Sequence, residues 1–288
     1  MLLYSSVDSI DKKPCVREWI EKQFNKHDWC LGWNQLKFIK VLSEGGCIIT
    51  KSHRNSGMST MIIMHICYNI LHGKFSDVAV IGTGRENAWY REAIKKVLMD
   101  CDEVAYVHKD DSFKLSVTVQ GNLKTINYIP YDNMTSYVCG KKYDFISIDN
   151  AAFLPNLERK AIMLKTCTSN FIIASCPKVS DSCDFKRIYE ESMKSLNSWR
   201  AFSFSWYMDT RKYPKVCWFP KQIDASKPFL DRDSIIKDNY RTEEYALSMY
   251  SAGYTPYIDM SFPEHGENVE TEIYGNFKYQ ENVTRKIK

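Results

Sequence analysis

The sequence predicts an α/β fold, in which a mostly parallel sheet is flanked by helices and followed by a small C-terminal subdomain. Short segments of strand length alternate with helical segments, the strand segments are apolar on both faces, and polar residues directly follow each of them. Of the 288 residues, 44% are hydrophobic and 26% are charged, as in ordinary globular proteins, which excludes wholesale disorder.

The first part of the chain alternates between helical and strand patterns. Pro14 suits the first turn of a helix, and Gly45-Gly46 marks a turn before the first strand. The predicted helices of this part cover residues 15–26, 34–42, 61–71 and 87–99. The predicted strands that are apolar on both faces cover residues 47–50, 78–81, 143–148 and 170–174. Because the parallel strands of such a sheet end at one edge, we expect the loops after Thr50, Ile81, Ile148 and Ala174 to converge there.

The remaining elements are less regular. Residues 112–130 alternate in polarity around Gly121-Asn122, which predicts a hairpin, and residues 157–165 predict a helix. We expect a core over residues 1–198 and a small helical or mixed subdomain with a polar tail over 199–288. In that subdomain, 202–206 suit a strand and 232–251 suit an amphipathic helix.

Composition and spacing exclude several classes of protein. The formal net charge of +4 permits a nucleic-acid partner without arguing for one. The ten cysteines include no C-x-x-C pair, and the six histidines show no zinc-binding spacing, so we expect reduced thiols and no zinc site. We also expect no secretory signal and no membrane span.

The polar loop over 51–60, placed between a strand and an apolar helix, has the layout of a phosphate-binding loop. Unpaired amides and the positive end of the helix dipole attract phosphate there, and Ser59 or Thr60 suits Mg²⁺. The loop lacks the strict G-x-x-x-x-G-K-[ST] pattern, because Met58 stands where the lysine belongs. An ordinary strand–helix turn is therefore the alternative interpretation.

A second feature is the apolar segment over 143–148, which ends in Asp149-Asn150. A carboxylate at the end of a buried strand suits a Walker B site, where it reaches the Mg²⁺ shell. The next residue usually activates water, but the Asn150 amide orients water and accepts no proton. A buried strand with a polar end is again the alternative.

The order of these motifs resembles the ATPase domain of the large terminase subunit, the DNA-packaging motor of tailed bacteriophages. The resemblance covers residues 33–206 and, more loosely, the helical part that extends to Ala252. It depends on four segments in sequence, namely Gly32-Trp33-Asn34-Gln35, the loop over 51–60, Asp149-Asn150-Ala151-Ala152-Phe153-Leu154-Pro155 and Ala174-Ser175-Cys176-Pro177.

The resemblance implies a P-loop NTPase fold that binds ATP and Mg²⁺. It implies that Gln35 reads adenine, that Arg54 is the arginine of Walker A, that Asp149 binds Mg²⁺ together with Ser59 and Thr60, and that Ser175 belongs to the coupling motif. Asn150, Arg54 and Ser175 would then be the catalytic set. The nucleotide-binding set would be Gln35, Lys51, Arg54, Asn55, Ser56, Gly57, Met58, Ser59 and Thr60, with Lys51 supplying the charge that Met58 lacks.

The resemblance also implies double-stranded DNA, a portal protein and a small terminase subunit as partners, a homo-oligomeric ring, and a location in the cytoplasm of an infected host cell. No nuclease domain is expected, because only 34 residues follow Tyr254. Because Met58 and Asn150 depart from the family pattern, a non-hydrolysing terminase-like protein with a structural or regulatory role is the alternative. A helicase-like role is weaker, since no helicase-type motif follows the coupling segment.

Tryptophans and basic residues alternate after residue 198, as in Trp199-Arg200 and the later Trp206 and Trp218. Such a pattern suits contact with a DNA backbone, although the core and rim of a subdomain is the more common role for these residues.

Overall fold

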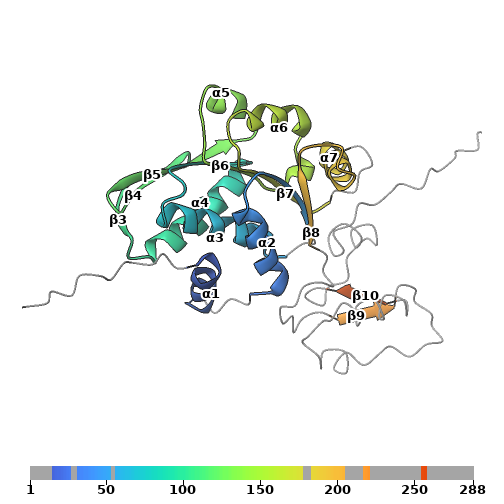
Figure 1. Cartoon of the computed structure of the whole chain (residues 1–288), viewed down its shortest axis with the longest axis horizontal. Coiled ribbons are helices and arrows are strands. Elements are labelled where there is room, and N and C mark those ends of the chain that lie inside the picture. The colour runs from blue at the N-terminus through green and yellow to red at the C-terminus, as the bar shows by residue number, and fades with distance from the viewer. Residues whose placement is uncertain are drawn as a thin grey trace, which may run out of the picture.

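The computed structural model describes residues 15–26, 31–52, 56–177, 183–204, 217–220 and 254–257. Within them, an eight-stranded sheet lies between two layers of helices (Figure 1). The strands of this sheet are β1 (Cys47–Ser52), β2 (Asp77–Gly82), β3 (Val104–Asp110), β4 (Lys114–Val119), β5 (Asn122–Pro130), β6 (Phe145–Ile148), β7 (Phe171–Ser175) and β8 (Arg200–Phe204). Two short antiparallel strands, β9 (Cys217–Pro220) and β10 (Tyr254–Tyr257), form a separate sheet.

The main sheet has the strand order β3-β4-β5-β2-β6-β7-β1-β8. All neighbouring pairs are parallel except those that involve β4, which runs antiparallel to both β3 and β5. The sheet is thus mostly parallel, as the sequence predicted, and the hairpin over 112–130 is confirmed as the β4–β5 pair.

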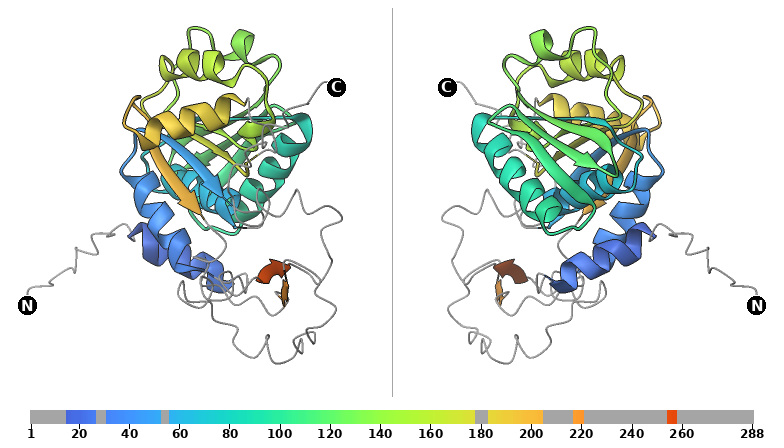
Figure 2. Two further views of the ribbon diagram at one scale, coloured as in Figure 1. Left: turned by 90° about the vertical axis from the view of Figure 1, so that its right-hand side faces the viewer. Right: turned by 90° about the vertical axis from the view of Figure 1, so that its left-hand side faces the viewer.

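Helices cover both faces of the sheet, as the two opposite views of Figure 2 show. One face carries α1 (Val16–Lys26), α2 (Trp33–Ser43), α3 (Met58–Leu71) and α4 (Gly84–Met99). The other carries α5 (Met134–Val138), the 3₁₀ turn η1 (Ala151–Phe153), α6 (Leu157–Lys165) and α7 (Asp184–Met193). Each face has its own cluster of buried apolar side chains.

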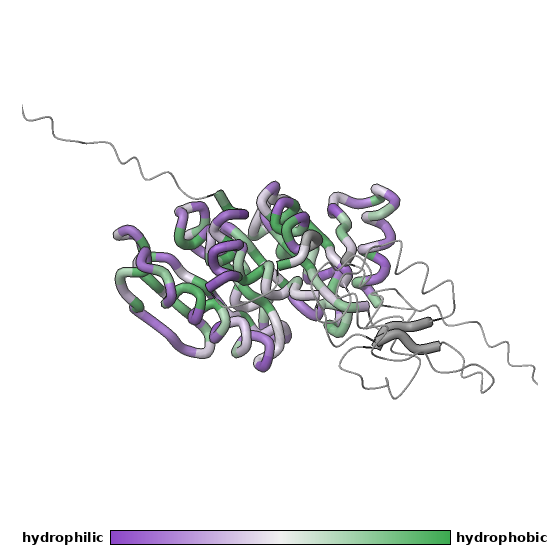
Figure 3. Tube along the Cα trace, turned by 90° about the horizontal axis from the view of Figure 1, so that it is seen from below, coloured by the Kyte–Doolittle hydropathy of each residue, from purple (hydrophilic) through white to green (hydrophobic). Residues whose placement is uncertain are grey.

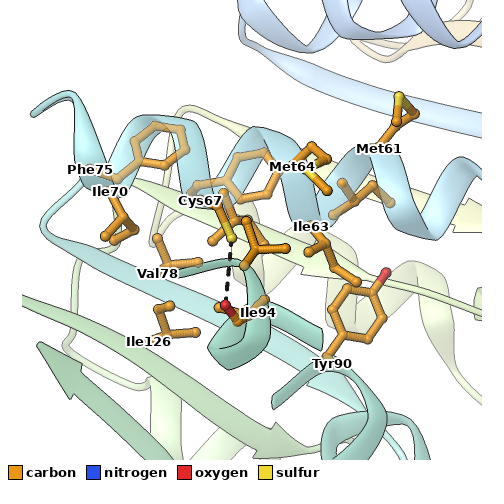
Figure 4. Packing of buried hydrophobic residues seen from close by; sticks show 14 of the residues in the cluster. Met61, Ile63, Met64, Cys67, Ile70, Phe75, Val78, Tyr90, Ile94 and Ile126 are labelled. Atoms are coloured by element: carbon orange, nitrogen blue, oxygen red, sulfur yellow. Dashed lines mark hydrogen bonds between the residues drawn. The ribbon is translucent and has the colours of Figure 1, made fainter. Parts of the chain in front are cut away.

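The central helix α3 explains why the first face packs so tightly. It is apolar on all sides, because it contacts the sheet beneath it and the helices on either side. Figure 4 shows Ile63 and Cys67 of α3 beside Tyr90 and Ile94 of α4, where the Cys67 thiol donates to the Ile94 carbonyl over 3.9 Å. Figure 3 shows that the hydrophobic stretches of the described chain lie mostly inside and the hydrophilic stretches mostly outside.

Two helices begin earlier than the sequence predicted. Residues 58–60, which we assigned to a loop, form the first turn of α3, and residues 84–86 form the first turn of α4. The early start of α4 has a clear cause in a capping box. The Thr83 hydroxyl accepts from the Glu86 amide (3.4 Å), and the Glu86 carboxylate accepts from the Thr83 amide (2.8 Å).

The main sheet also extends further along the chain than the expected core. Strand β8 pairs with β1 over its whole length, so the sheet reaches Phe204 and passes the boundary that we placed at residue 198. Trp199 is buried against Phe171, and Arg200 forms an ion pair with Glu44, so both have structural roles here. Trp206 and the predicted helix over 232–251 lie outside the described residues.

None of the helices that the structure describes has the length and apolar character required to cross a membrane. The expected subdomain over 199–288 stays a prediction.

Candidate functional site

The carboxyl ends of the central parallel strands meet at one edge of the sheet. Lys51 near the end of β1 is in register with Ser175 of β7, and Ile148 of β6 is in register with both Ile173 of β7 and Ile81 of β2. The polar residues after these strands therefore share one edge, as the sequence predicted. This edge is the candidate site.

The start of α3 lies at this edge and offers amide donors. Gly57 precedes the helix with φ +74°, a left-handed conformation that favours glycine, and provides no capping side chain. The Ser56 hydroxyl accepts from the Met58 amide over 3.3 Å. The amides of Ser59 and Thr60 belong to the first turn, where no carbonyl of the helix itself is available as acceptor.

Asp149 is the most tightly held acidic group at this edge. One carboxylate oxygen accepts from the Ser59 hydroxyl (2.5 Å) and from the Tyr90 hydroxyl (2.9 Å), and the other accepts from the Asn150 amide (2.8 Å). Asp149 thus connects β6 to the first turn of α3 and to α4. Its side chain is buried, and no lysine or arginine among the described residues pairs with it.

The electrostatics of this group follow from burial. Burial raises the pKa of Asp149, and the hydrogen bonds from Ser59, the Asn150 amide and Tyr90 offset part of that rise. Burial and the nearby Asp149 charge raise the pKa of Tyr90 well above its ordinary value, so Tyr90 keeps its proton and acts as a donor. A buried carboxylate without a cationic partner is a group that a divalent cation would stabilise.

The donor set is chemically suited to Mg²⁺. Asp149 supplies a carboxylate, and Ser59 and Thr60 supply hydroxyls, all of them hard oxygen ligands. The described residues contain no cluster of three or more His, Cys, Asp or Glu side chains that could hold a metal alone. One carboxylate is nevertheless typical of Mg²⁺ sites, where phosphate oxygens and waters complete the shell.

Two residues at this edge were missed in the sequence analysis, namely Glu86 and Tyr90 of α4. The Glu86 carboxylate accepts from the Asn150 side-chain amide over 2.7 Å, and Tyr90, one helical turn later, binds Asp149. The segment Thr83-Gly84-Arg85-Glu86 was the available signal, since a capping box fixes the direction of a glutamate at a helix start.

Met58, which stands at the position of the Walker A lysine, is buried, and Lys51, which would supply the missing charge, is half-buried. Met58 is 4% exposed and belongs to the apolar cluster around α3. The Lys51 ammonium lies 5.2 Å from the ring centroid of Tyr189 on α7, and burial lowers its pKa despite the nearby Glu190. Lys51 therefore extends toward the face that carries α7, while α3 covers the opposite face.

Gln35 and Ser175 join separate parts of the site through backbone contacts. The buried Gln35 amide accepts from the Gly32 amide (2.8 Å) and donates to the Ser56 carbonyl (3.2 Å), so it ties α2 to the segment before α3. The Ser175 hydroxyl, which is fully buried, accepts from the Ala152 amide (3.1 Å) and donates to the Cys176 carbonyl (2.7 Å).

Two predicted site residues, Arg54 and Asn55, lie outside the described residues. Glu158, the first acidic side chain downstream of Asn150, forms an exposed ion pair with Arg187 of α7.

Comparisons with known proteins identify the fold. No protein-family model matches the chain, and no curated protein sequence matches it significantly. Among solved structures, a mutant form of the large terminase ATPase domain of Thermus phage P74-26 matches with a TM-score of 0.51 and 14% identity, covering 65% of this chain and 86% of that one. The unmodified P74-26 domain gives a TM-score of 0.50 at 14% identity over the same shares of the two chains.

The large terminase of bacteriophage HK97 matches with a TM-score of 0.51 and 12% identity, covering 86% of this chain and 50% of that one. The chain therefore has the fold of large terminase ATPase domains. It spans half the length of the HK97 protein.

Proposed function

We propose that this chain is the ATPase module of a terminase-type motor, which binds ATP with Mg²⁺ and uses its hydrolysis to move double-stranded DNA into a capsid. The single observation that carries the proposal is the contact between Asp149 at the end of β6 and Ser59 in the first turn of α3. This contact brings a metal-binding carboxylate to a phosphate-binding helix start, in a fold shared with terminase ATPase domains.

Each part of the site has a defined task in this scheme. The amides of Ser59 and Thr60 bind phosphate, assisted by Arg54, Asn55, Ser56 and Gly57 in the segment before α3, and Gln35 holds that segment against α2. Lys51 of β1 adds its charge to the phosphate site only after its ammonium leaves the ring of Tyr189. Asp149, Ser59 and Thr60 hold Mg²⁺, which neutralises charge on the phosphates when bound. Contact with adenine would use the second N–H or the second oxygen lone pair of the Gln35 side chain, which these two backbone hydrogen bonds leave open.

Ser175 provides a route from the site to the rest of the sheet. Its hydroxyl links the end of β7 to Ala152, only two residues after Asn150. If the segment 149–152 shifts on hydrolysis, it would therefore displace the end of β7. By the same resemblance we propose a homo-oligomeric ring, a portal protein and a small terminase subunit as partners, and the cytoplasm of an infected host cell as the location.

One observation favours a second candidate, a terminase-like protein that binds nucleotide without hydrolysing it. Met58 replaces the Walker A lysine and is buried in the core, so that position supplies no cation to the β- and γ-phosphates.

ATP affinity and turnover of the full chain, with and without linear double-stranded DNA, test the proposal. We expect saturable ATP binding that requires Mg²⁺, and turnover that DNA stimulates. Asp149→Asn should remove the Mg²⁺ requirement together with tight binding. Asp132→Asn, which alters an exposed carboxylate just after β5, is the matched control and should leave both unchanged. Binding without turnover would favour the second candidate, and absence of binding would contradict both.

A further inference from the structure

The residue after Asp149 lacks the group that ATP hydrolysis requires there. Water that attacks a phosphate must lose a proton, and the Asn150 amide has no basic site to accept it. Its side chain nevertheless contacts a carboxylate, because the Asn150 amide donates to Glu86 over 2.7 Å. The pair keeps one amide and one carboxylate at this point of the site.

Glu86 is held in place from several directions. One carboxylate oxygen accepts from Asn150 and the other accepts from the Thr83 amide over 2.8 Å. Gly82, the last residue of β2, lets the side chain pass close to the backbone, since a Cβ at this position would lie 3.0 Å from a Glu86 carboxylate oxygen. Each carboxylate oxygen retains a second lone pair for a proton.

The same helix directs two side chains to the Walker B segment. Glu86 and Tyr90 are four residues apart on α4, which places them on one helix face, and they bind Asn150 and Asp149 respectively. Strand β2, which leads into α4, is paired in parallel with β6, so this contact follows from the sheet order. Glu86 is therefore part of the candidate site.

The backbone of Asn150 explains why an amide occupies this position. Its φ of +52° lies in the left-handed region, which asparagine adopts far more readily than glutamate.

We propose that Glu86 accepts the proton of the attacking water in place of a Walker B glutamate, and that Asn150 is a positioning residue that holds Glu86. This inference rests on the proposed ATPase function. In the step, the water oxygen forms a bond to the γ-phosphorus, and the bond from that phosphorus to the bridging oxygen breaks. The bond's electron pair stays with ADP. The water proton passes to Glu86, which later releases it to solvent.

Three single substitutions separate this role from a structural one. Glu86→Gln keeps the contact with Asn150 and removes the base, so turnover should fall about 10²–10⁴-fold with ATP affinity unchanged. Thr83→Ala removes the other half of the capping box and retains the carboxylate, so it should lower the Tm and reduce turnover far less than Glu86→Gln does. Glu92→Gln, on the same helix and paired only with Arg91 among the described residues, should change neither.

An exchange of the pair is the decisive variant. Asn150→Glu alone sets two carboxylates against each other and should not raise turnover above wild type. Asn150→Glu combined with Glu86→Gln moves the carboxylate to position 150 and keeps an amide partner, so it should recover part of the turnover lost in Glu86→Gln, although glutamate must adopt the left-handed backbone there. Recovery by this exchange is not expected of a residue that only caps α4.

The possible outcomes distinguish the two proposals. If wild type hydrolyses ATP and Glu86→Gln matches it, the role of Glu86 is refuted while the ATPase function stands. If wild type binds ATP in a fluorescent-analogue titration but shows no turnover, Glu86 is not a base, and the non-hydrolysing candidate is supported. If wild type binds no ATP, the proposed function itself fails.

Discussion

Tyr90→Phe removes one hydroxyl from the centre of the candidate site. Tyr90 is 2% exposed and its hydroxyl donates to Asp149 over 2.9 Å. Burial keeps the pKa of Tyr90 far above neutral pH, so this donor is always protonated. The substitution leaves Asp149 with its contacts from Ser59 and the Asn150 amide, and it introduces no other change in shape.

The free energy of unfolding that Tyr90→Phe should remove follows from the charge of the acceptor, Asp149. A hydrogen bond to an ionised group contributes about 1.5–3 kcal/mol, so Tyr90→Phe should lower the free energy of unfolding by that amount near pH 7. For a domain of this size, that loss corresponds to a fall in Tm of about 3–12 °C. Loss of the donor raises the pKa of Asp149 further, so the destabilisation should be largest where Asp149 is ionised and should shrink as pH falls and Asp149 becomes protonated.

Thermal unfolding of the two variants Tyr90→Phe and Tyr128→Phe, without added Mg²⁺, measures this effect. Tyr128 is equally buried, but its hydroxyl has no hydrogen-bond partner among the described residues, so Tyr128→Phe should be neutral or stabilising. Equal Tm values for the two variants would refute the reasoning, because the Tyr90 contact would then contribute nothing beyond packing.

Two further predictions concern the core and the coupling segment. Burial, reinforced by Lys74, lowers the pKa of His65 to about 3. The unfolded chain binds this proton below about pH 6.5, so stability should fall as pH decreases from there, by up to about 1.4 kcal/mol per pH unit. Urea unfolding between about pH 7 and pH 5 should show this slope in wild type and lose it in His65→Phe; equal slopes would contradict it. Ser175→Ala should cost about 1–3 kcal/mol in thermal unfolding, because the buried Ala152 amide loses its acceptor. The control Ser147→Ala removes a buried hydroxyl without a described partner and should be neutral, so equal losses would contradict the role of Ser175.

The central strands were predictable because burial on both faces makes them continuously apolar. Strands β1, β2, β6 and β7 were all predicted with small differences at their ends. Strand β3 was missed, because it lies at the edge of the sheet and its side chains are mostly exposed, so it lacks a continuously apolar buried pattern. Helix α7 was also missed, although it covers the sheet beside α6.

The candidate site was predictable where a residue follows a buried strand or belongs to a recognisable motif. Asp149 follows a buried strand, so its place at the sheet edge follows from the pattern. Glu86 and Tyr90 come from a helix, and their position depends on the pairing of β2 with β6, which no local pattern reveals. Met58 was known to break the lysine pattern, but its burial against the core depends on the start of α3 three residues earlier than predicted.

The proposed function depends on a nucleotide site formed by the first turn of α3 and Asp149. Equilibrium titration of the full chain with a fluorescent ATP analogue, in the presence of Mg²⁺ and in the presence of a chelator, measures whether this site exists. We expect saturable binding that weakens strongly when Mg²⁺ is removed and that is lost in Asp149→Ala. Binding that is absent in wild type, or that is equally tight in Asp149→Ala with and without Mg²⁺, would contradict it.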